Sequence, residues 1–301
     1  MNLRFSIIIP SYNEGDDIRL SIESALNQDY LEREILVIDD SHDNTPSIIQ
    51  EYERMGVRLI KGKQNGCCGA RNFGIETAIG DIVVLLNADV VLPKDFLNRL
   101  AAHYHSGADY VLVESLTFNT DRFFARFTEM QYRNYEYARL GEKIEWTEGF
   151  SARREALLKI GLIPGNFKLR FCRDWLLGLG LKNAGFKKVI DRSIVVSHKS
   201  PDNFKEYWMV RKARGRFGAL MQYFLYKKSI SFLIFKFIAK DVIFILRFLT
   251  ILPSFTRAYK ISNYPRSPFK DVVLFWWAYF LQELARAIGE WEGIKLVIRN
   301  K

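Results

Sequence analysis

The sequence predicts an α/β fold, in which a mainly parallel sheet is flanked by helices. Three observations support this prediction. Short β-rich runs alternate with helical patterns along the first 115 residues. The β-rich runs are almost wholly apolar, as is typical of strands that are buried on both faces. With 301 residues, of which 49% are hydrophobic, the chain is large enough to bury a core of this kind.

The expected elements follow one another in a regular order. The β-branched and aromatic runs predict strands at 4–10, 34–39, 57–62, 81–86 and 109–114. Helical periodicity predicts helices at 16–27, 45–54, 69–78 and 94–105. In the first of these, Ile18, Ile22 and Ala25 share one face of the helix. Right-handed crossovers of this length join parallel strands.

The chain beyond residue 120 is less regular. An aromatic helix is expected after Asp121, and a helix at 203–226 carries Arg211, Lys212, Arg214 and Arg216. We therefore expect a catalytic domain at 1–225 and a compositionally different region at 226–301. The charge also divides unevenly, because residues 199–301 hold 19 Lys and Arg against 7 Asp and Glu, and the rest of the chain holds 25 against 27. The basic excess of the last third indicates an acidic partner for that part.

Polar residues follow four of the predicted strands. They lie at 11–17 (SYNEGDD), 39–45 (DDSHDNT), 63–72 (KQNGCCGARN) and 87–89 (NAD). One such cluster alone is typical of a helix cap or a turn. In doubly wound sheets, however, ligands bind beyond the carboxyl ends of the strands, so four clusters at one edge predict a binding site.

Two nucleotide-binding motifs are excluded. The segment after the first strand reads Pro-Ser-Tyr-Asn-Glu, which lacks the glycine pattern of a dinucleotide site, and no phosphate-binding P-loop is present. The three cysteines, of which two are adjacent, predict neither a disulfide framework nor a zinc site, as is typical of a reducing compartment.

The motifs in their order resemble those of the family 2 glycosyltransferases. The matching segments are SIIIPSYNE (6–14), ILVIDDSHDNT (35–45), NGCCGARNFGI (65–75), VVLLNADVVL (83–92), EGFSARREAL (148–157), RDW (173–175) and HKSP (198–201). The resemblance covers roughly residues 4–220. It implies a GT-A fold and an inverting transfer of a sugar from a nucleoside diphosphate.

The resemblance also implies roles for individual residues. The nucleotide would be bound by Pro10, Tyr12, Glu14, Asp39, Asp40, Arg71 and Ala88. A Mg²⁺ or Mn²⁺ ion would be held by Asp89 and His198 and would neutralise the leaving diphosphate. The family has Asp-x-Asp where this chain has Asn87-Ala88-Asp89, so only Asp89 supplies charge.

Asp174 is the candidate base for the acceptor hydroxyl, because it stands where the resemblance implies that residue. The alternative is that Asp174 only caps the helix that follows it. Further candidates for contacts to the diphosphate or the acceptor are Asn87, Glu148, Gly149, Arg173, Arg211 and Arg214.

The region after residue 226 contains two apolar helical patterns. In 229–253, Lys236, Lys240 and Arg247 fall on one narrow stripe among Phe, Ile and Leu, and in 271–290 the polar residues cover about a third of the circumference. These helices would pack on the catalytic domain, lie in the plane of a membrane surface, or span the membrane. We favour amphipathic helices that lie in the membrane surface with their basic residues on anionic headgroups.

The sequence as a whole predicts a metal-dependent inverting glycosyltransferase on the cytoplasmic face of the cell membrane. It would move a hexose from GDP-mannose or a UDP-hexose, between which the residues do not decide, to a lipid-linked or glycan acceptor. A non-catalytic sugar-nucleotide or membrane-binding protein on a degenerate scaffold is the alternative, with Asn87 and Arg173 in its favour. Nucleic-acid binding is not expected, because the basic residues lie among Phe and Ile runs.

Overall fold

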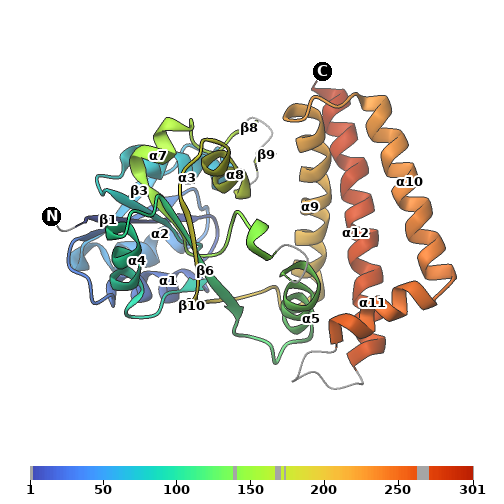
Figure 1. Ribbon diagram of the computed structural model, residues 1–301, viewed down its shortest axis with the longest axis horizontal. Helices are drawn as coiled ribbons and strands as arrows, with labels where there is room; N and C mark the ends of the chain where they lie inside the picture. The colour runs from blue at the N-terminus through green and yellow to red at the C-terminus, as the bar shows by residue number, and fades with distance from the viewer. Residues whose placement is uncertain (1–2, 138–140, 167–170, 173, 263–270, 301) are drawn as a thin grey trace. The chain divides into compact units, whose positions relative to one another are not determined.

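The computed structural model describes residues 3–137, 141–166, 171–172, 174–262 and 271–300 (Figure 1). The chain forms two compact units. The sheet unit comprises residues 1–116 and 142–199, and the helical unit comprises residues 117–141 and 200–301.

The sheet unit is built on an eight-stranded sheet with the order β3-β2-β1-β4-β7-β6-β10-β5. Its strands are β1 (Phe5–Ser11), β2 (Arg33–Asp39), β3 (Val57–Lys61), β4 (Ile82–Leu85), β5 (Val90–Val91), β6 (Tyr110–Thr117), β7 (Phe150–Arg153) and β10 (Lys188–His198). The four strands β3, β2, β1 and β4 are parallel, as predicted. Three further pairings, β4 with β7, β7 with β6 and β10 with β5, are antiparallel. Strands β8 (Gly165–Asn166) and β9 (Phe171–Cys172) form a separate pair.

Helices flank this sheet (Figure 1). They are α1 (Ile18–Leu26), α2 (Thr45–Gln50), α3 (Gly66–Thr77), α4 (Phe96–His105), α7 (Arg154–Lys159) and α8 (Trp175–Asn183), with short 3₁₀ turns at η1 (Glu53–Met55) and η3 (Gly141–Lys143). Ile7 and Ile9 of β1 pack in the main core with α1 and α4. Ile8 points to the other face, where a Cβ on Gly74 of α3 would stand 2.4 Å from its Cγ2. Both faces of the sheet are therefore covered, and the predicted α/β fold is confirmed.

The helical unit contains α5 (Phe123–Gln131), the π-helix η2 (Tyr132–Tyr137), α9 (Phe204–Phe224), α10 (Ile230–Leu249), α11 (Leu252–Ser262) and α12 (Asp271–Arg299). Helices α9 and α12 pack backbone to backbone. A Cβ on Gly215 would lie 2.2 Å from the carbonyl oxygen of Arg286, and a Cβ on Gly289 would lie 2.0 Å from that of Lys212. Because α9 packs on α12 in this way, the division expected at residue 225 does not coincide with a boundary between the two units.

Several charged residues of the helical unit face inward. Asp271 and Glu290 of α12 are buried, and they bind Arg126 of α5 and Lys240 of α10, respectively. Of the basic stripe predicted on α10, Lys240 is thus turned toward α12 rather than outward. Trp291 Nε1 donates to Asp241 Oδ2 at 2.9 Å and adds a second polar contact between the two helices.

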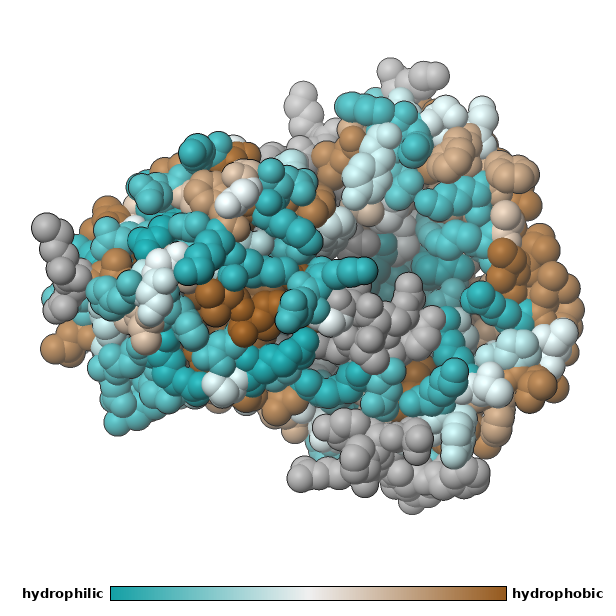
Figure 2. Space-filling view, in the orientation of Figure 1, coloured by the Kyte–Doolittle hydropathy of each residue, from teal (hydrophilic) through white to brown (hydrophobic). Residues whose placement is uncertain are grey.

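Apolar side chains cover much of the outer surface of the same helices. Figure 2 shows them gathered over α10. The exposed ones on α10, α12 and the turn after α10 are Phe232, Phe235, Ile238, Val242, Ile243, Ile245, Leu246, Leu249, Ile251, Leu252, Val273, Leu274, Trp277, Ile288 and Ile298. An exposed apolar area of this extent is typical of an interaction surface. None of the helices in the described ranges is both long and apolar enough to cross a bilayer.

Candidate functional site

The four polar segments predicted at the strand ends are joined by hydrogen bonds. The amide of Asn13, after β1, donates to Ser41 Oγ, after β2, at 2.8 Å. The amide of Gln64, before α3, donates to Asp40 Oδ1 at 3.0 Å. Arg71 of α3 donates to Asn87 Oδ1, after β4. The sheet therefore brings the segments together at one edge, as the parallel order of β3, β2, β1 and β4 requires.

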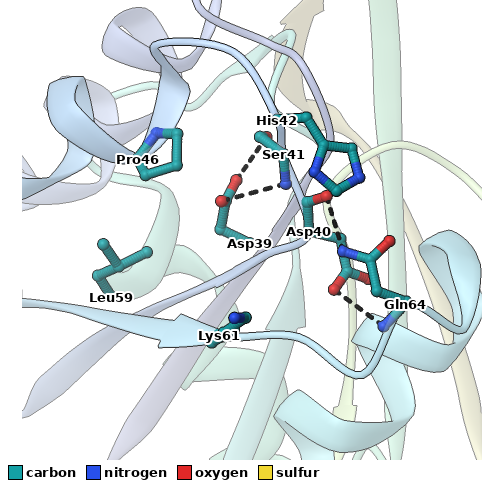
Figure 3. Close-up of a pocket in the computed structure, with 8 residues that line it drawn as sticks. All are labelled: Asp39, Asp40, Ser41, His42, Pro46, Leu59, Lys61 and Gln64. Atoms are coloured by element: carbon teal, nitrogen blue, oxygen red, sulfur yellow. Dashed lines mark hydrogen bonds between the residues drawn. The ribbon is translucent and has the colours of Figure 1, made fainter.

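A pocket of about 510 Å³ opens beside β2 and β3 (Figure 3). It is lined by Asp39, Asp40, Ser41, His42, Pro46, Leu59, Lys61 and Gln64. Asp39 is buried, and its carboxylate accepts hydrogen bonds from Ser11 Oγ at 2.5 Å and from Ser41 Oγ at 2.6 Å. These two hydroxyl groups stabilise its charge and fix the carboxylate in place.

Asp40 lines the same pocket and lies beside Gln64 (Figure 3). Gly62 lies against it so closely that a Cβ there would come 2.2 Å from Asp40 Oδ1. Gln64 Nε2 also donates to the Asp40 carbonyl at 3.0 Å (Figure 3). The structure thus places Asp39 and Asp40 in one pocket with both polar and apolar walls, a combination that suits a nucleoside base and its ribose.

The turn after β1 places an aromatic ring at this edge. Pro10 is buried in β1, whereas Tyr12 is exposed and lies edge-on to His42, with ring centroids 6.0 Å apart. Asn13 has a φ of 57°, a left-handed conformation that Asn tolerates. The Asn13 side chain fixes the turn by accepting from the amide of His42 at 3.0 Å.

Asp89 and His198 lie side by side in the sheet unit. The antiparallel pairing of β10 with β5 places His198 opposite Val90, and His198 Nε2 is 3.2 Å from Asp89 Oδ2. The other carboxylate oxygen of Asp89, Oδ1, is buried and has no hydrogen-bond partner in the described part of the chain. An orphaned carboxylate oxygen next to an imidazole fits a divalent cation. No cluster of three or more His, Cys, Asp or Glu suited to a metal occurs among the described residues. In proteins, Mg²⁺ commonly takes only one or two carboxylates and completes its coordination with phosphate and water oxygens.

Asn87 bridges two charged side chains. Its Oδ1 accepts from Arg71 Nη2, and its Nδ2 donates to Glu148 Oε2 at 2.6 Å. Arg71 is almost fully buried, and its guanidinium lies 5.3 Å from the centre of the Trp146 ring. The amide oxygen of Asn87 is therefore occupied by Arg71. Ala88, between Asn87 and Asp89, is buried.

Glu148 precedes Gly149, whose φ of +74° is left-handed and suits glycine. Burial raises the pKa of Glu148, and the carboxylates of Asp89 and Asp174 raise it further, while His198 and Arg71 oppose the shift. Glu148 is thus close to both the candidate metal ligands and the candidate base.

Asp174 has two partners. It stands at the N-cap of α8, where its Oδ1 accepts from the amide of Trp175 at 2.9 Å. Its Oδ2 lies 3.3 Å from Arg71 Nη1, and about a third of the side chain is exposed. Asp174 therefore does cap α8, and its carboxylate is still accessible to a substrate. Arg173 lies outside the described residues.

Glu14 lies near the same acidic group. Its pKa is raised to about 7 by burial and then by the charges of Asp89, Asp17 and Asp43, while Lys199 lowers it. Lys199 Nζ binds Asp17 at 2.6 Å. The excess of negative charge around Asp89 is a setting in which a divalent cation is favourable.

Arg211 and Arg214 belong to the helical unit. Arg211 is buried, donates to Thr128 Oγ1 at 2.9 Å and lies over the Tyr207 ring at 5.0 Å. Arg214 is exposed on α9. A contact of either residue with phosphate stays a prediction.

Sequence reasoning missed Ser21, which organises the turn that carries Asp89. Its hydroxyl lies within hydrogen-bond distance of the carbonyl oxygens of Asn87, Ala88 and Val90, at 3.0, 2.7 and 2.6 Å. A serine on the apolar face of a helix, between Ile18 and Ile22, was the signal in the sequence. Trp146 was missed as well, because only the fold brings it to Arg71.

The cysteine expectation is wrong in one respect. Cys68 of α3 is disulfide-bonded, whereas Cys67 is a free cysteine. The side chain of the partner of Cys68 is outside the described part of the structure. The adjacent pair in the sequence concealed this bond, since adjacent cysteines carry no spacing signal.

Comparison with known proteins places this site in context. Residues 6–162 match the model of glycosyl transferase family 2. The chain is 40% identical over 86 residues to the Escherichia coli UDP-Glc:alpha-D-GlcNAc-diphosphoundecaprenol beta-1,3-glucosyltransferase WfgD, an alignment that covers 28% of this chain and 34% of WfgD. It is 34% identical over 113 residues to the Rhizobium meliloti succinoglycan biosynthesis protein ExoO, with 37% of this chain and 32% of ExoO covered. The chain therefore spans less than half the length of the curated relatives it matches. For ExoO and two further glycosyltransferases, the aligned part is between 26% and 39% of the relative's length.

Two solved structures share the fold over nearly the whole chain. S. aureus TarS 1-349 in complex with UDP-GlcNAc superposes with a TM-score of 0.55 at 16% identity, over 99% of this chain and 93% of TarS 1-349. The mannosyltransferase PcManGT from Pyrobaculum calidifontis, in complex with GDP-Man and Mn²⁺, gives 0.54 at 16% identity, over 100% and 76%. These likenesses confirm the predicted GT-A fold.

Proposed function

Because the chain belongs to glycosyl transferase family 2, we propose that it is a metal-dependent inverting glycosyltransferase that moves a hexose from a nucleoside-diphosphate sugar to a lipid-linked acceptor. The observation that carries the proposal is the buried, unpartnered Oδ1 of Asp89 beside His198 in the described chain, at the same sheet edge as the Asp39–Asp40 pocket. A nucleoside in that pocket and a cation at Asp89 account for both features.

Each part of the substrate has a group that suits it. The Asp39–Asp40 pocket would hold the nucleoside, with Tyr12 beside it against His42, and Arg71 would lie near the diphosphate next to Asn87. Asp89 and His198 would hold Mg²⁺ or Mn²⁺, which supplies neutralisation of the diphosphate charge when bound. As the acceptor oxygen attacks C1 of the sugar and the bond from C1 to the diphosphate breaks, Asp174 takes the proton of the acceptor hydroxyl. Arg71 holds Asp174 in position from the buried side.

The donor can be identified by a binding panel. We expect one nucleoside diphosphate among UDP, GDP, ADP, CDP and dTDP to raise the melting temperature, and Mn²⁺ to increase that rise. A ligand at 100 times its Kd stabilises the folded protein by about 2.7 kcal/mol. UDP and GDP are the leading candidates, because the name of WfgD specifies UDP-Glc and PcManGT was solved with GDP-Man. If none of the five shifts the melting temperature with or without Mn²⁺, the proposal fails.

A second candidate function is sugar-nucleotide binding without turnover. The engagement of the Asn87 oxygen by Arg71 favours it, because that oxygen is then not directed to a metal. Binding of a nucleoside diphosphate with no donor hydrolysis and no transfer would support this candidate over the first.

The membrane surface is the partner that we propose for α10 and α12. An amphipathic helix on a protein in water turns its polar side chains outward and its apolar side chains toward the core. In α10 and α12, Lys240, Glu290 and Asp271 face neighbouring helices and many apolar side chains face outward. Lys227 and Lys228, which are exposed and directly precede α10, add the positive charge that anionic headgroups attract. The helices would then lie in the interface with their apolar face in the acyl boundary.

This membrane contact can be tested with Ile245→Glu/Leu249→Glu, which places two charges on the outward face of α10. Burying one such apolar side chain fully contributes about 1.5–3 kcal/mol, so we expect binding to anionic vesicles to fall roughly tenfold or more. Flotation with phosphatidylglycerol-containing vesicles measures the change.

The matched control is Leu31→Glu/Ile79→Glu, which adds the same charges at two exposed positions of the sheet unit. The control should float as the wild type does. Equal binding by both double variants, or a wild-type protein that forms a concentration-dependent dimer and ignores vesicles, would refute the membrane proposal.

A further inference from the structure

Asn87 and Glu148 are cross-strand neighbours although they are 61 residues apart. Strands β4 and β7 pair antiparallel, and the last pair of the register is Leu85 with Phe150. Continuing that register by two residues sets Asn87 opposite Glu148. The hydrogen bond from Asn87 Nδ2 to Glu148 Oε2, at 2.6 Å, shows that the alignment continues beyond the strands.

The two partners of Asn87 require both ends of an amide. Arg71 is a donor only, so it needs the amide oxygen, and the Glu148 carboxylate is an acceptor, so it needs the amide nitrogen. Aspartate offers no donor. A carboxylate in place of the Asn87 amide would satisfy Arg71 but would stand against the carboxylate of Glu148, and like charges at that separation repel. An amide at position 87 therefore satisfies both neighbours, whereas a carboxylate would satisfy only Arg71.

Glu148 is also joined to the candidate base, because Asn87 contacts both Glu148 and Arg71, and Arg71 in turn contacts Asp174. The charges of His198 and Asp89, the candidate metal ligands, and of Asp174, the candidate base, all act on its carboxylate. The sugar has to sit between the metal-bound diphosphate and the base. In the described part of the chain, Oε2 of Glu148 is held by Asn87, and Oε1 accepts no hydrogen bond.

We propose that Glu148 binds a hydroxyl group of the transferred sugar and that Asn87 is the positioning residue that holds it there. In this chain Glu148 then supplies the second acidic group of the site, in the role that a carboxylate two residues before Asp89 would otherwise fill. The inference rests on the proposed function, because it needs a sugar donor in the site.

Three variants test the pair, namely Asn87→Asp, Glu148→Gln and the double variant. We expect Glu148→Gln to lower affinity for the sugar nucleotide about tenfold, because a charged acceptor to a hydroxyl is lost. Asn87→Asp should have a comparable effect in the wild-type background. It should have little effect in the Glu148→Gln background, since the glutamine amide can donate a hydrogen bond to the new carboxylate. Affinity for the nucleoside diphosphate without its sugar should stay within about twofold in all three variants.

Asn98→Asp is the control, because Asn98 is exposed on α4 and the substitution makes the same chemical change away from the site. It should change neither affinity. Equal effects of Asn87→Asp in the two backgrounds would overturn the positioning role, and unchanged sugar-nucleotide affinity in Glu148→Gln would overturn the sugar contact. The melting temperatures of the four variants show whether each is folded. A wild-type protein that binds no nucleotide would instead refute the proposed function, and the two failures are thereby distinguished.

Discussion

Asp89→Ala is expected to lower the rate of sugar transfer roughly a thousandfold and to abolish the effect of Mn²⁺ on nucleotide binding. The physical reason is the position of its carboxylate. Oδ1 is buried with no hydrogen-bond partner in the described chain, and Oδ2 lies 3.2 Å from His198 Nε2. A cation at that point stabilises the charge of the leaving diphosphate by several kcal/mol, and without Asp89 the protein retains one metal ligand of the two.

The measurement is donor turnover with and without acceptor, together with Mn²⁺ titrations of nucleotide affinity. Asp95→Ala serves as the matched control, since Asp95 is exposed in the loop that follows β5. It should behave as the wild type does. A Mn²⁺ effect that survives in Asp89→Ala would show that the metal is held elsewhere. Turnover that survives would remove the role of Asp89 altogether, and its loss would exclude the non-catalytic candidate.

Asp174→Asn should lower kcat by about 10² to 10⁴-fold, the range typical of a general base. Asparagine retains an oxygen that can accept from the amide of Trp175 and is as good an N-cap residue as aspartate, so α8 should keep its start. The substitution therefore separates the catalytic role from the capping role. Affinity for the nucleoside diphosphate should change little, because the base acts on the acceptor.

Asp174→Ala is the variant to compare with Asp174→Asn, because it removes the helix cap as well as the base. We expect both variants to lose kcat equally, and only Asp174→Ala to lose about 0.5–2 kcal/mol of stability from the cap as well. Equal kcat in Asp174→Asn and the wild type would leave Asp174 a capping residue only. Thermal unfolding and initial-rate kinetics on the same preparations measure both quantities.

The sequence predicted the parallel half of the sheet well. Apolar runs of β-branched residues mark β1, β2 and β4 directly, and the polar residues after them lie at one edge because parallel strands end together. Local patterns of this kind depend only on neighbours in the chain. The family assignment followed from the same segments.

The antiparallel half of the sheet could not be predicted from local sequence patterns. Strand β7 consists of Phe-Ser-Ala-Arg, which has no strand pattern, and its partner β4 lies more than 60 residues earlier in the chain. The contact of Asn87 with Glu148 depends on that pairing, so the sequence could show only that Asn87 departs from the family pattern.

The sequence predicted the helices of the helical unit, but it did not predict which way their polar faces point. Periodicity located α10 and α12 and identified the polar faces, including Lys240 and Glu290. A single helix does not reveal whether its polar face meets water or another helix, because that choice depends on the charges of the neighbour. Here the neighbouring helix carries opposite charges, and the polar faces meet each other.

The pairing of β4 with β7 has a consequence for folding fidelity. Three of the four residues of β7 are buried, so burial alone discriminates poorly between alternative alignments of the strand. Side-chain hydrogen bonds of β7 favour the observed alignment, namely Tyr104 Oη to Ser151 Oγ at 2.8 Å and Arg153 Nη2 to the Tyr104 carbonyl at 2.8 Å. A slip by one residue would turn Glu148 away from Asn87 while leaving the chain compact. A misaligned protein would then lose catalytic activity although its secondary structure content stayed the same. Activity, rather than secondary structure content, would show whether the strand is correctly aligned.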